Sequence, residues 1–148
     1  MKKCILISLI IIMGCEDVKH ESIDENQLVF VASEGNYGSS NGSISVFRGG
    51  EKIQQLENIG DVLQSIVVHN DKLIVALNNS HFLKIYEITI DGLLLPGIEI
   101  STNNSSPREM VVLNNKLYFT NWNTNDVKVL NLITYAIESA ISLNGLPE

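Results

Sequence analysis

Cysteine and histidine are the most chemically versatile residues in this chain, and both are scarce. The chain has two cysteines, Cys4 and Cys15, and three histidines, His20, His69 and His81. A metal site built from the histidines would need three distant segments to converge, so we expect no metal centre. The sequence also has no Gly-rich phosphate loop, no His-Glu-x-x-His motif and no nucleophile elbow. It therefore assigns no catalytic residue and no cofactor.

Cys15 lies where an apolar run stops. Residues 1–3 (Met-Lys-Lys) are basic, residues 4–13 are apolar in character, and Gly14 precedes the cysteine. A basic start, a short apolar core and a small residue at the cut predict a secretory signal peptide, and the run is shorter than the roughly 20 residues that span a bilayer. Residues 12–15 (Ile-Met-Gly-Cys) resemble the bacterial lipoprotein signal. That resemblance implies removal of residues 1–14 and lipid on Cys15, and an ordinary secretory cut that leaves a free thiol is the alternative.

Charge and thiol content limit the partners of the mature chain. The formal net charge is −7, and removal of Lys2 and Lys3 makes it −9. Such an acidic balance argues against nucleic acid, because phosphate binding needs clustered Lys and Arg. Once Cys4 is removed and Cys15 is lipidated, no thiol remains for a disulfide, a metal or catalysis. Residues 15–27 are then a lipidated cysteine with an acidic tether, and we expect a lipid-anchored protein of the bacterial envelope, at the outer membrane or cell surface rather than the inner membrane.

A repeat with an offset of 44 residues organises the rest of the chain. Residues 64–76 (QSIVVHNDKLIVA) align without a gap to 108–120 (REMVVLNNKLYFT), and 83–86 (LKIY) align to 127–130 (VKVL). An earlier copy includes residues 29–32 (VFVA) and carries five extra residues in a Gly/Ser/Asn-rich loop. Four short strands in a unit of about 40 to 45 residues are typical of a propeller blade.

Each repeat predicts short strands joined by tight turns. The Asn-containing pairs at 70–71 and 114–115 predict hairpins, because Asn and Asp tolerate a positive φ. Residues 133–141 in isolation could form a helix, but their place in the repeat assigns them to a turn and an outer strand. We therefore expect an all-β fold, a partial β-propeller of about three four-stranded antiparallel blades, at about residues 28–60, 61–103 and 104–148.

The last copy carries a family motif. Residues 118–121 (YFTN) differ from Tyr-Val-Thr-Asn at one position, and 127–131 (VKVLN) and 107–112 (PREMVV) fit the Val-x-Val-Ile-Asp and Pro-x-x-Ile-x-Val strands of the same repeat. The chain thus resembles the YVTN repeat of YncE-like and surface-layer-type β-propellers over residues 28–148. The other copies depart further, with Leu63 in place of the proline. The resemblance implies the fold but little chemistry, because propellers host many unrelated functions.

A propeller places two sets of loops on one face, the loops that enter each inner strand and those that join its second and third strands. Here they are residues 33–43, 60–64, 78–81, 101–108 and 121–125, which are rich in Asn and Ser. Trp122 and Tyr37 could stack on a ligand there and Arg108 could bind an anionic group. In the alternative interpretation, which has no ligand, Trp122 packs between blades and Arg108 pairs with a neighbouring acid. The candidates for a ligand face are Glu34, Tyr37, His81, Arg108, Glu109 and Trp122.

Two classes of function fit these observations. The first is a lipid-anchored envelope propeller that binds a glycan, a peptide or a protein. The second is a propeller enzyme, a lactonase-like hydrolase or part of a redox protein, in which Glu34 or Glu109 would help to hold a divalent metal. Closed propellers have four to eight blades, while residues 28–148 hold fewer than three full repeats. Residues 145–148 (GLPE) match the entry to a new inner strand, so we expect a fourth blade to follow in a longer protein.

Overall fold

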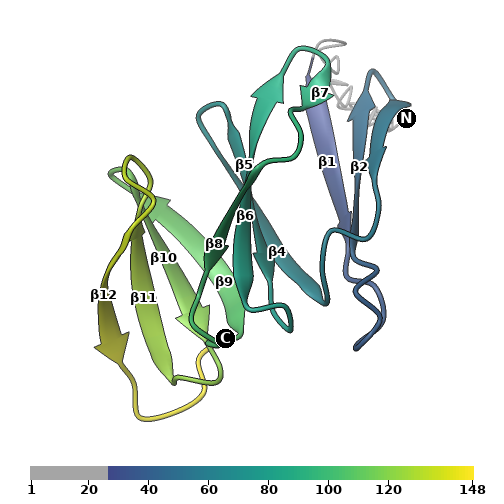
Figure 1. Ribbon diagram of the computed structural model, residues 1–148. Helices are drawn as coiled ribbons and strands as arrows, with labels where there is room; N and C mark the ends of the chain where they lie inside the picture. Colours follow the sequence, from purple (N-terminus) through teal and green to yellow (C-terminus); the bar gives the residue numbers. More distant parts are fainter. Residues whose placement is uncertain (1–26) are drawn as a thin grey trace, which may run out of the picture.

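The computed structural model describes residues 27–148, which form strands and turns without a helix. In this part of the chain no helix is long and apolar enough to cross a membrane. The strands make three antiparallel sheets, called blades 1, 2 and 3 below, which stack side by side along the chain (Figure 1). The prediction of an all-β, partial propeller is confirmed.

The three blades differ in strand number. Blade 1 has the order β1-β2-β3, with β1 (Leu28–Ser33), β2 (Ser43–Arg48) and β3 (Glu51–Leu56). Blade 2 has β4 (Leu63–His69), β5 (Lys72–Leu77), β6 (Phe82–Thr89) and β8 (Ile98–Ser101), and the two-residue β7 (Gly92–Leu93) also pairs with β6. Blade 3 has β9 (Pro107–Leu113), β10 (Lys116–Asn121), β11 (Asp126–Asn131) and β12 (Ile137–Ser142).

Blades 1 and 2 depart from the expected four strands. β1 lies 44 residues before β5, so blade 1 starts at its second strand, and only Gln27 precedes it in the described part of the chain. Blade 2 gains β7 because its connection from β6 to β8 is longer than the matching turn of blade 3. This short strand reaches blade 1, where the Gln54 side chain donates to the Leu93 carbonyl at 2.9 Å and accepts from the Leu93 N–H at 2.7 Å.

The tight hairpins predicted from Asn pairs are present. His69 pairs with Lys72 across the first turn, and Leu113 pairs with Lys116 across the second. Asn70 and Asn114 have φ angles of 54° and 49°. These values lie in the left-handed region, where Asn is one of the few residues found regularly. Residues 137–142 form a strand and not a helix, as the repeat predicted.

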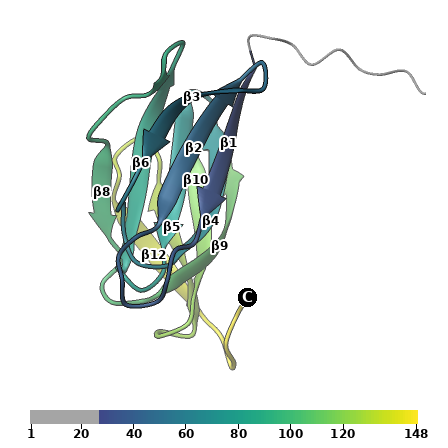
Figure 2. The same cartoon turned by 90° about the vertical axis from the view of Figure 1, so that its right-hand side faces the viewer.

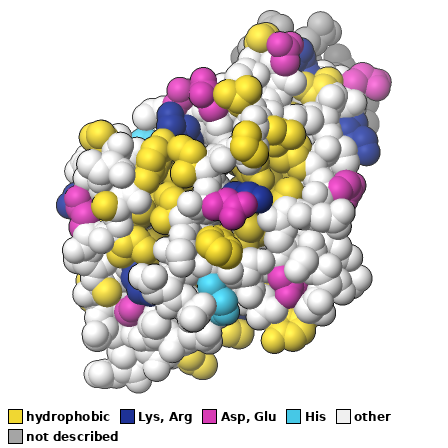
Figure 3. Space-filling model, in the orientation of Figure 1, with side chains coloured by type: hydrophobic (Ala, Val, Ile, Leu, Met, Phe, Trp, Pro, Cys, Tyr) yellow, Lys and Arg dark blue, Asp and Glu magenta, His cyan; other side chains and the backbone are white. Residues whose placement is uncertain are grey.

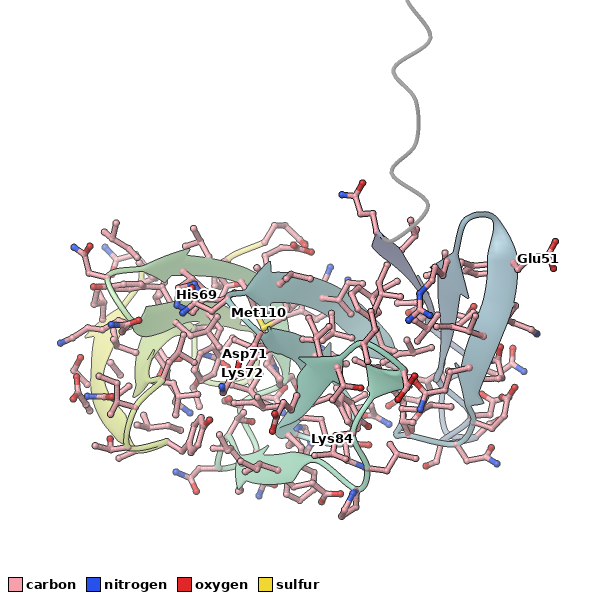
Figure 4. All side chains as sticks on the ribbon, turned by 90° about the horizontal axis from the view of Figure 1, so that it is seen from above. Glu51, His69, Asp71, Lys72, Lys84 and Met110 are labelled. Carbon is pink, nitrogen blue, oxygen red and sulfur yellow. The ribbon has the colours of Figure 1, made fainter. Side chains whose placement is uncertain are left out.

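Two apolar layers hold the blades together. Between blades 2 and 3, one side of blade 2 packs on blade 3, and Met110 lies between the two sheets when the molecule is seen from above (Figure 4). This layer contains Ile74, Ala76, Leu83 and Ile85 from blade 2 and Leu117, Phe119, Leu130 and Leu132 from blade 3. The opposite side of blade 2 packs on blade 1 through a second layer, with Ile44 and Val46 against Leu73, Val75 and Tyr86. Figure 2 looks onto blade 1 and shows the sheets one behind another.

The blades have two distinct ends. One, called the loop end below, holds the connections from the second strand to the third and from each blade to the next. The other, the hairpin end, holds the turns at Asn70 and Asn114. β1 runs from the hairpin end to the loop end, because Leu28 pairs with Arg48 and Ser33 pairs with Ser43. The chain therefore enters the described domain at the hairpin end.

Candidate functional site

Hydrogen bonds join the loops that the sequence placed on one face. At the boundary of blades 1 and 2, the Leu63 N–H donates to the Glu34 carbonyl at 3.1 Å. The Asn78 N–H donates to the Val62 carbonyl at 2.8 Å, and one repeat later the Trp122 N–H donates to the Ser106 carbonyl at 3.1 Å. The same backbone bond thus recurs at an offset of 44 residues, so the loop end is built by the repeat itself.

Asp61 is the buried carboxylate of this region. It is 6% exposed, and both of its oxygens lie 3.0 Å from the Gly38 N–H. Asn79 Nδ2 donates to Oδ2 at 2.6 Å, and the Asp61 N–H donates to Ser80 Oγ at 2.8 Å. One carboxylate therefore ties the long loop of blade 1 to the loop between β5 and β6 of blade 2.

Blade 3 has a different buried polar group at its loop end. Ser105 Oγ donates to Asn121 Oδ1 at 2.5 Å, and Asn121 Nδ2 donates to Asp126 Oδ1 at 2.9 Å. Thr124 Oγ1 donates to the same Asp126 oxygen at 2.8 Å. Because buried polar groups are costly unless they are paired, this closed set of bonds fixes the loop between β10 and β11.

Arg108 and Trp122, both predicted for the ligand face, are brought together. The Arg108 guanidinium carbon lies 3.7 Å from the centre of the Trp122 ring, a cation–π stack. Arg108 Nη2 donates to Glu148 Oε2 at 2.6 Å, so the neighbouring acid that the alternative interpretation required is present. Arg108 Nε and Trp122 Nε1 are shielded from solvent and have no hydrogen-bond partner among the described residues. The cluster holds one carboxylate and retains two further donors.

His81 occupies the loop between β5 and β6 with a φ of 58°. Its Nδ1 lies 3.2 Å from the Ser106 N–H and 3.3 Å from Ser106 Oγ. Since the backbone N–H can only donate, Nδ1 is an acceptor here and the ring proton resides on Nε2. His81 therefore links blade 2 to the loop that enters blade 3.

The other ligand-face candidates lie apart from the Arg108–Trp122 pair. Tyr37 is 81% exposed in the long loop of blade 1 and Glu34 is exposed beside it. Glu109 points to the outer side of blade 3, where it lines a hollow with Val111 and Tyr118. Within residues 27–148, no group of three or more His, Cys, Asp or Glu side chains could hold a metal ion. Cys15 lies outside the described residues.

A pocket of about 420 Å³ lies elsewhere, on the rim between blades 2 and 3. Its walls are largely apolar and include Leu94, Leu95 and Tyr135, with Lys72 and Glu87 at its edge. Hydrophobic side chains gather over the middle of this face of the molecule (Figure 3). None of the predicted site residues lines this pocket.

Sequence reasoning missed the polar residues that shape the loop end: the buried Asp61, Ser105, Asn121 and Asp126 and the half-buried Asn79. The repeat carried a signal for some of them. Asp61 and Ser105 hold the same repeat position, as do Asn79 and Asn123, and Asn123 Nδ2 donates to the Asn104 carbonyl at 3.1 Å. Polar residues that recur at one position of a repeat indicate a structural bond, even where the partner changes from one copy to the next.

Comparison with known proteins identifies the architecture. No protein-family model and no curated protein matches the chain. Among solved structures, it is similar to the nidogen/laminin complex, with a TM-score of 0.62 and 12% identity over 78% of this chain and 43% of that chain. It is also similar to the WD40 β-propeller domain of Doa1, with a TM-score of 0.57 and 14% identity over 77% of this chain and 40% of that chain.

The chain is a partial β-propeller. AztD from Citrobacter koseri is a further similar structure, with a TM-score of 0.54 and 21% identity over 76% of this chain and 32% of that chain. At these identities the likeness shows the fold alone. This propeller chain spans between about a third and just over two fifths of the length of the three structures.

Proposed function

We propose that this chain is a lipid-anchored binding module of a bacterial cell envelope, in the manner of YncE-like YVTN propellers, and that its loop end binds a ligand that carries a carboxylate. The observation behind this proposal is the Arg108 guanidinium, stacked on Trp122 and already in contact with a carboxylate oxygen at 2.6 Å. A stacked guanidinium has a fixed plane, and Arg–carboxylate bonds are among the stronger hydrogen bonds in proteins.

The ion pair between Arg108 and Glu148 is of a kind that a ligand can displace. The Glu148 side chain is 72% exposed, whereas the Arg108 side chain is 16% exposed. An exposed partner held by one ion pair contributes little, so a competing carboxylate can replace it. Arg108 Nη2, which holds Glu148 at 2.6 Å, would then donate to the ligand.

The direction of the chain supports the anchor. The described domain begins at the hairpin end, while Arg108 and Trp122 lie at the loop end. A lipid on Cys15, followed by the short acidic tether, would hold the hairpin end near the membrane and the binding face away from it. Movement of the protein from the membrane fraction to the soluble fraction in the Cys15→Ser variant would test the anchor.

Trp122 is the one tryptophan of the chain, so its fluorescence reports directly on this site. We would titrate the protein with oligogalacturonate and with a polyglutamate peptide, which carry the same carboxylate on a glycan and on a peptide. We expect saturable fluorescence changes for one of them, and binding weakened about 10- to 100-fold by Arg108→Lys, which keeps the charge but loses the fork and the stack.

Two variants serve as controls. Arg48→Lys changes the other arginine, at the hairpin end of β2, and should leave binding unaltered. Glu148→Gln removes the resident carboxylate and should tighten binding. The proposal fails if neither probe changes the fluorescence of the wild-type protein or of Glu148→Gln, or if Arg108→Lys binds as tightly as the wild type.

A further inference from the structure

The outer face of blade 3 repeats a surface that is buried inside the molecule. Blade 2 packs on blade 3 through Ile74, Ala76 and Leu83, which are all fully buried. One repeat later the same positions are Tyr118, Thr120 and Val127, which are only partly buried on the opposite side of blade 3. With Val111, which is 62% exposed, they line a hollow of about 310 Å³. The carboxylates of Glu109 and Glu148 also line this hollow, so they must stay at the solvent-exposed border of any contact made there.

The outer face of blade 1 repeats the other half of the same contact. Leu117 and Phe119 of blade 3 pack against blade 2. Their counterparts in blade 2, Leu73 and Val75, pack against blade 1. One repeat earlier these positions are Val29 and Val31, which are 51% and 47% exposed. The contact between two blades has two complementary surfaces. In the described part of the chain, the outer face of blade 1 repeats one of them, the outer face of blade 3 repeats the other, and nothing packs on either face.

We propose that a second copy of this chain covers both faces, with blade 3 of each copy packed on blade 1 of the other. The two faces are complementary because the chain makes the same contact twice within itself, between blades 1 and 2 and between blades 2 and 3. Contact of blade 3 with blade 3 would instead oppose two surfaces of the same kind. A head-to-tail contact closes into a ring when the rotation permits, and two copies of three blades give six, within the four to eight blades of closed propellers.

Sedimentation velocity on the full chain carrying Cys15→Ser tests this proposal. We expect a single species at twice the 16.4 kDa mass of one chain. Val31→Asp places a charge on the outer face of blade 1, and Val111→Asp places one on the outer face of blade 3. Each variant alone should sediment as a monomer, because a buried unpaired carboxylate is strongly unfavourable. Ile90→Asp, in the turn after β6 and 68% exposed, is the matched control and should remain a dimer.

Mixing distinguishes the head-to-tail contact from other modes of association. Val31→Asp keeps an intact blade 3 face and Val111→Asp keeps an intact blade 1 face. The equimolar mixture should therefore regain a dimer that neither variant forms, joined by the one contact without a charge and open at the contact where the two aspartates meet. Circular dichroism should show both variants folded. A monomeric parent chain, a Val31→Asp variant that still dimerises alone, or an open series of larger assemblies would each overturn the proposal. A monomer would fit the other occupant of these faces, further blades of a longer chain.

Discussion

Blade 2 is covered on both sides, whereas blades 1 and 3 each have an uncovered outer face. Side chains at the same repeat positions are therefore buried on blade 2 and more exposed on these outer faces. Leu73 and Leu117 are completely buried, while Val29, at the same position of the first repeat, is 51% exposed. Ile74 is buried, while Tyr118 is only partly covered. A strand pattern therefore marks which positions can be buried, whereas a neighbouring blade decides which of them are. Three predictions test this comparison.

The largest difference should appear between Leu117→Ala and Val29→Ala. Leu117 is 0% exposed in the layer between blades 2 and 3, so truncation should lower the free energy of unfolding by about 2–5 kcal/mol. Val29→Ala should cost less than about 1 kcal/mol, because the side chain is half exposed. Urea denaturation of both in the Val111→Asp background keeps self-association out of the measurement. Equal losses would mean that burial by a neighbouring blade does not set the contribution of these positions to stability.

A smaller effect should come from Asp61→Asn, which tests how far the loop end holds blades 1 and 2 together. The amide keeps one oxygen, which at the Oδ2 position can accept from both the Gly38 N–H and Asn79 Nδ2. Its NH2 group then takes the place of Oδ1 and faces the Gly38 N–H. We expect a loss of about 1–3 kcal/mol in the free energy of unfolding, since two donors cannot satisfy each other.

Asp71→Asn is the matched control for this substitution. Asp71 lies at the hairpin end and its side chain is 61% exposed in an ion pair with Lys72. Denaturation should reveal no change in stability for this variant. If both variants behave alike, the buried carboxylate does not hold the two blades together.

The smallest effect at neutral pH should come from Tyr86→Phe, which makes the buried position of blade 2 resemble Phe47 on the outer face of blade 1. Burial, followed by the charge of Glu99, raises the pKa of Tyr86 from 10.0 to about 12. The folded state therefore keeps this proton more firmly than the unfolded state does. Its contribution to stability is complete below pH 10 and is lost as the pH rises towards 12.

Urea denaturation of the wild-type protein and of Tyr86→Phe between pH 8 and pH 11 measures this contribution. Above pH 10 the wild type should lose stability faster than the variant, by at most about 1.4 kcal/mol per pH unit. Parallel curves would show that the hydroxyl is not buried in the folded state.

The candidate site was only partly predictable. Arg108 and Trp122 are conspicuous residues in loops that a propeller brings together, so the sequence could nominate them, and the structure brings them into contact. Glu109 was nominated with Arg108, but alternation along β9 sends neighbouring side chains to opposite sides of the sheet, and Glu109 lines the outer hollow. Asp61 was missed because nothing in its own segment shows that Gly38 and Asn79 converge on it.

The amino-acid sequence is enough to specify the repeat, the strands and the hairpins, because these depend on local alternation and on the tolerance of Asn for a positive φ. It also determined that the loops of successive blades face one way. Tertiary structure alone decided which apolar residues are buried, where blade 2 gains β7, and how Asp61 and Arg108 are paired. These outcomes depend on contacts between segments far apart in the chain. For the same reason, the fate of Val31 and Val111 depends on whatever packs against blades 1 and 3.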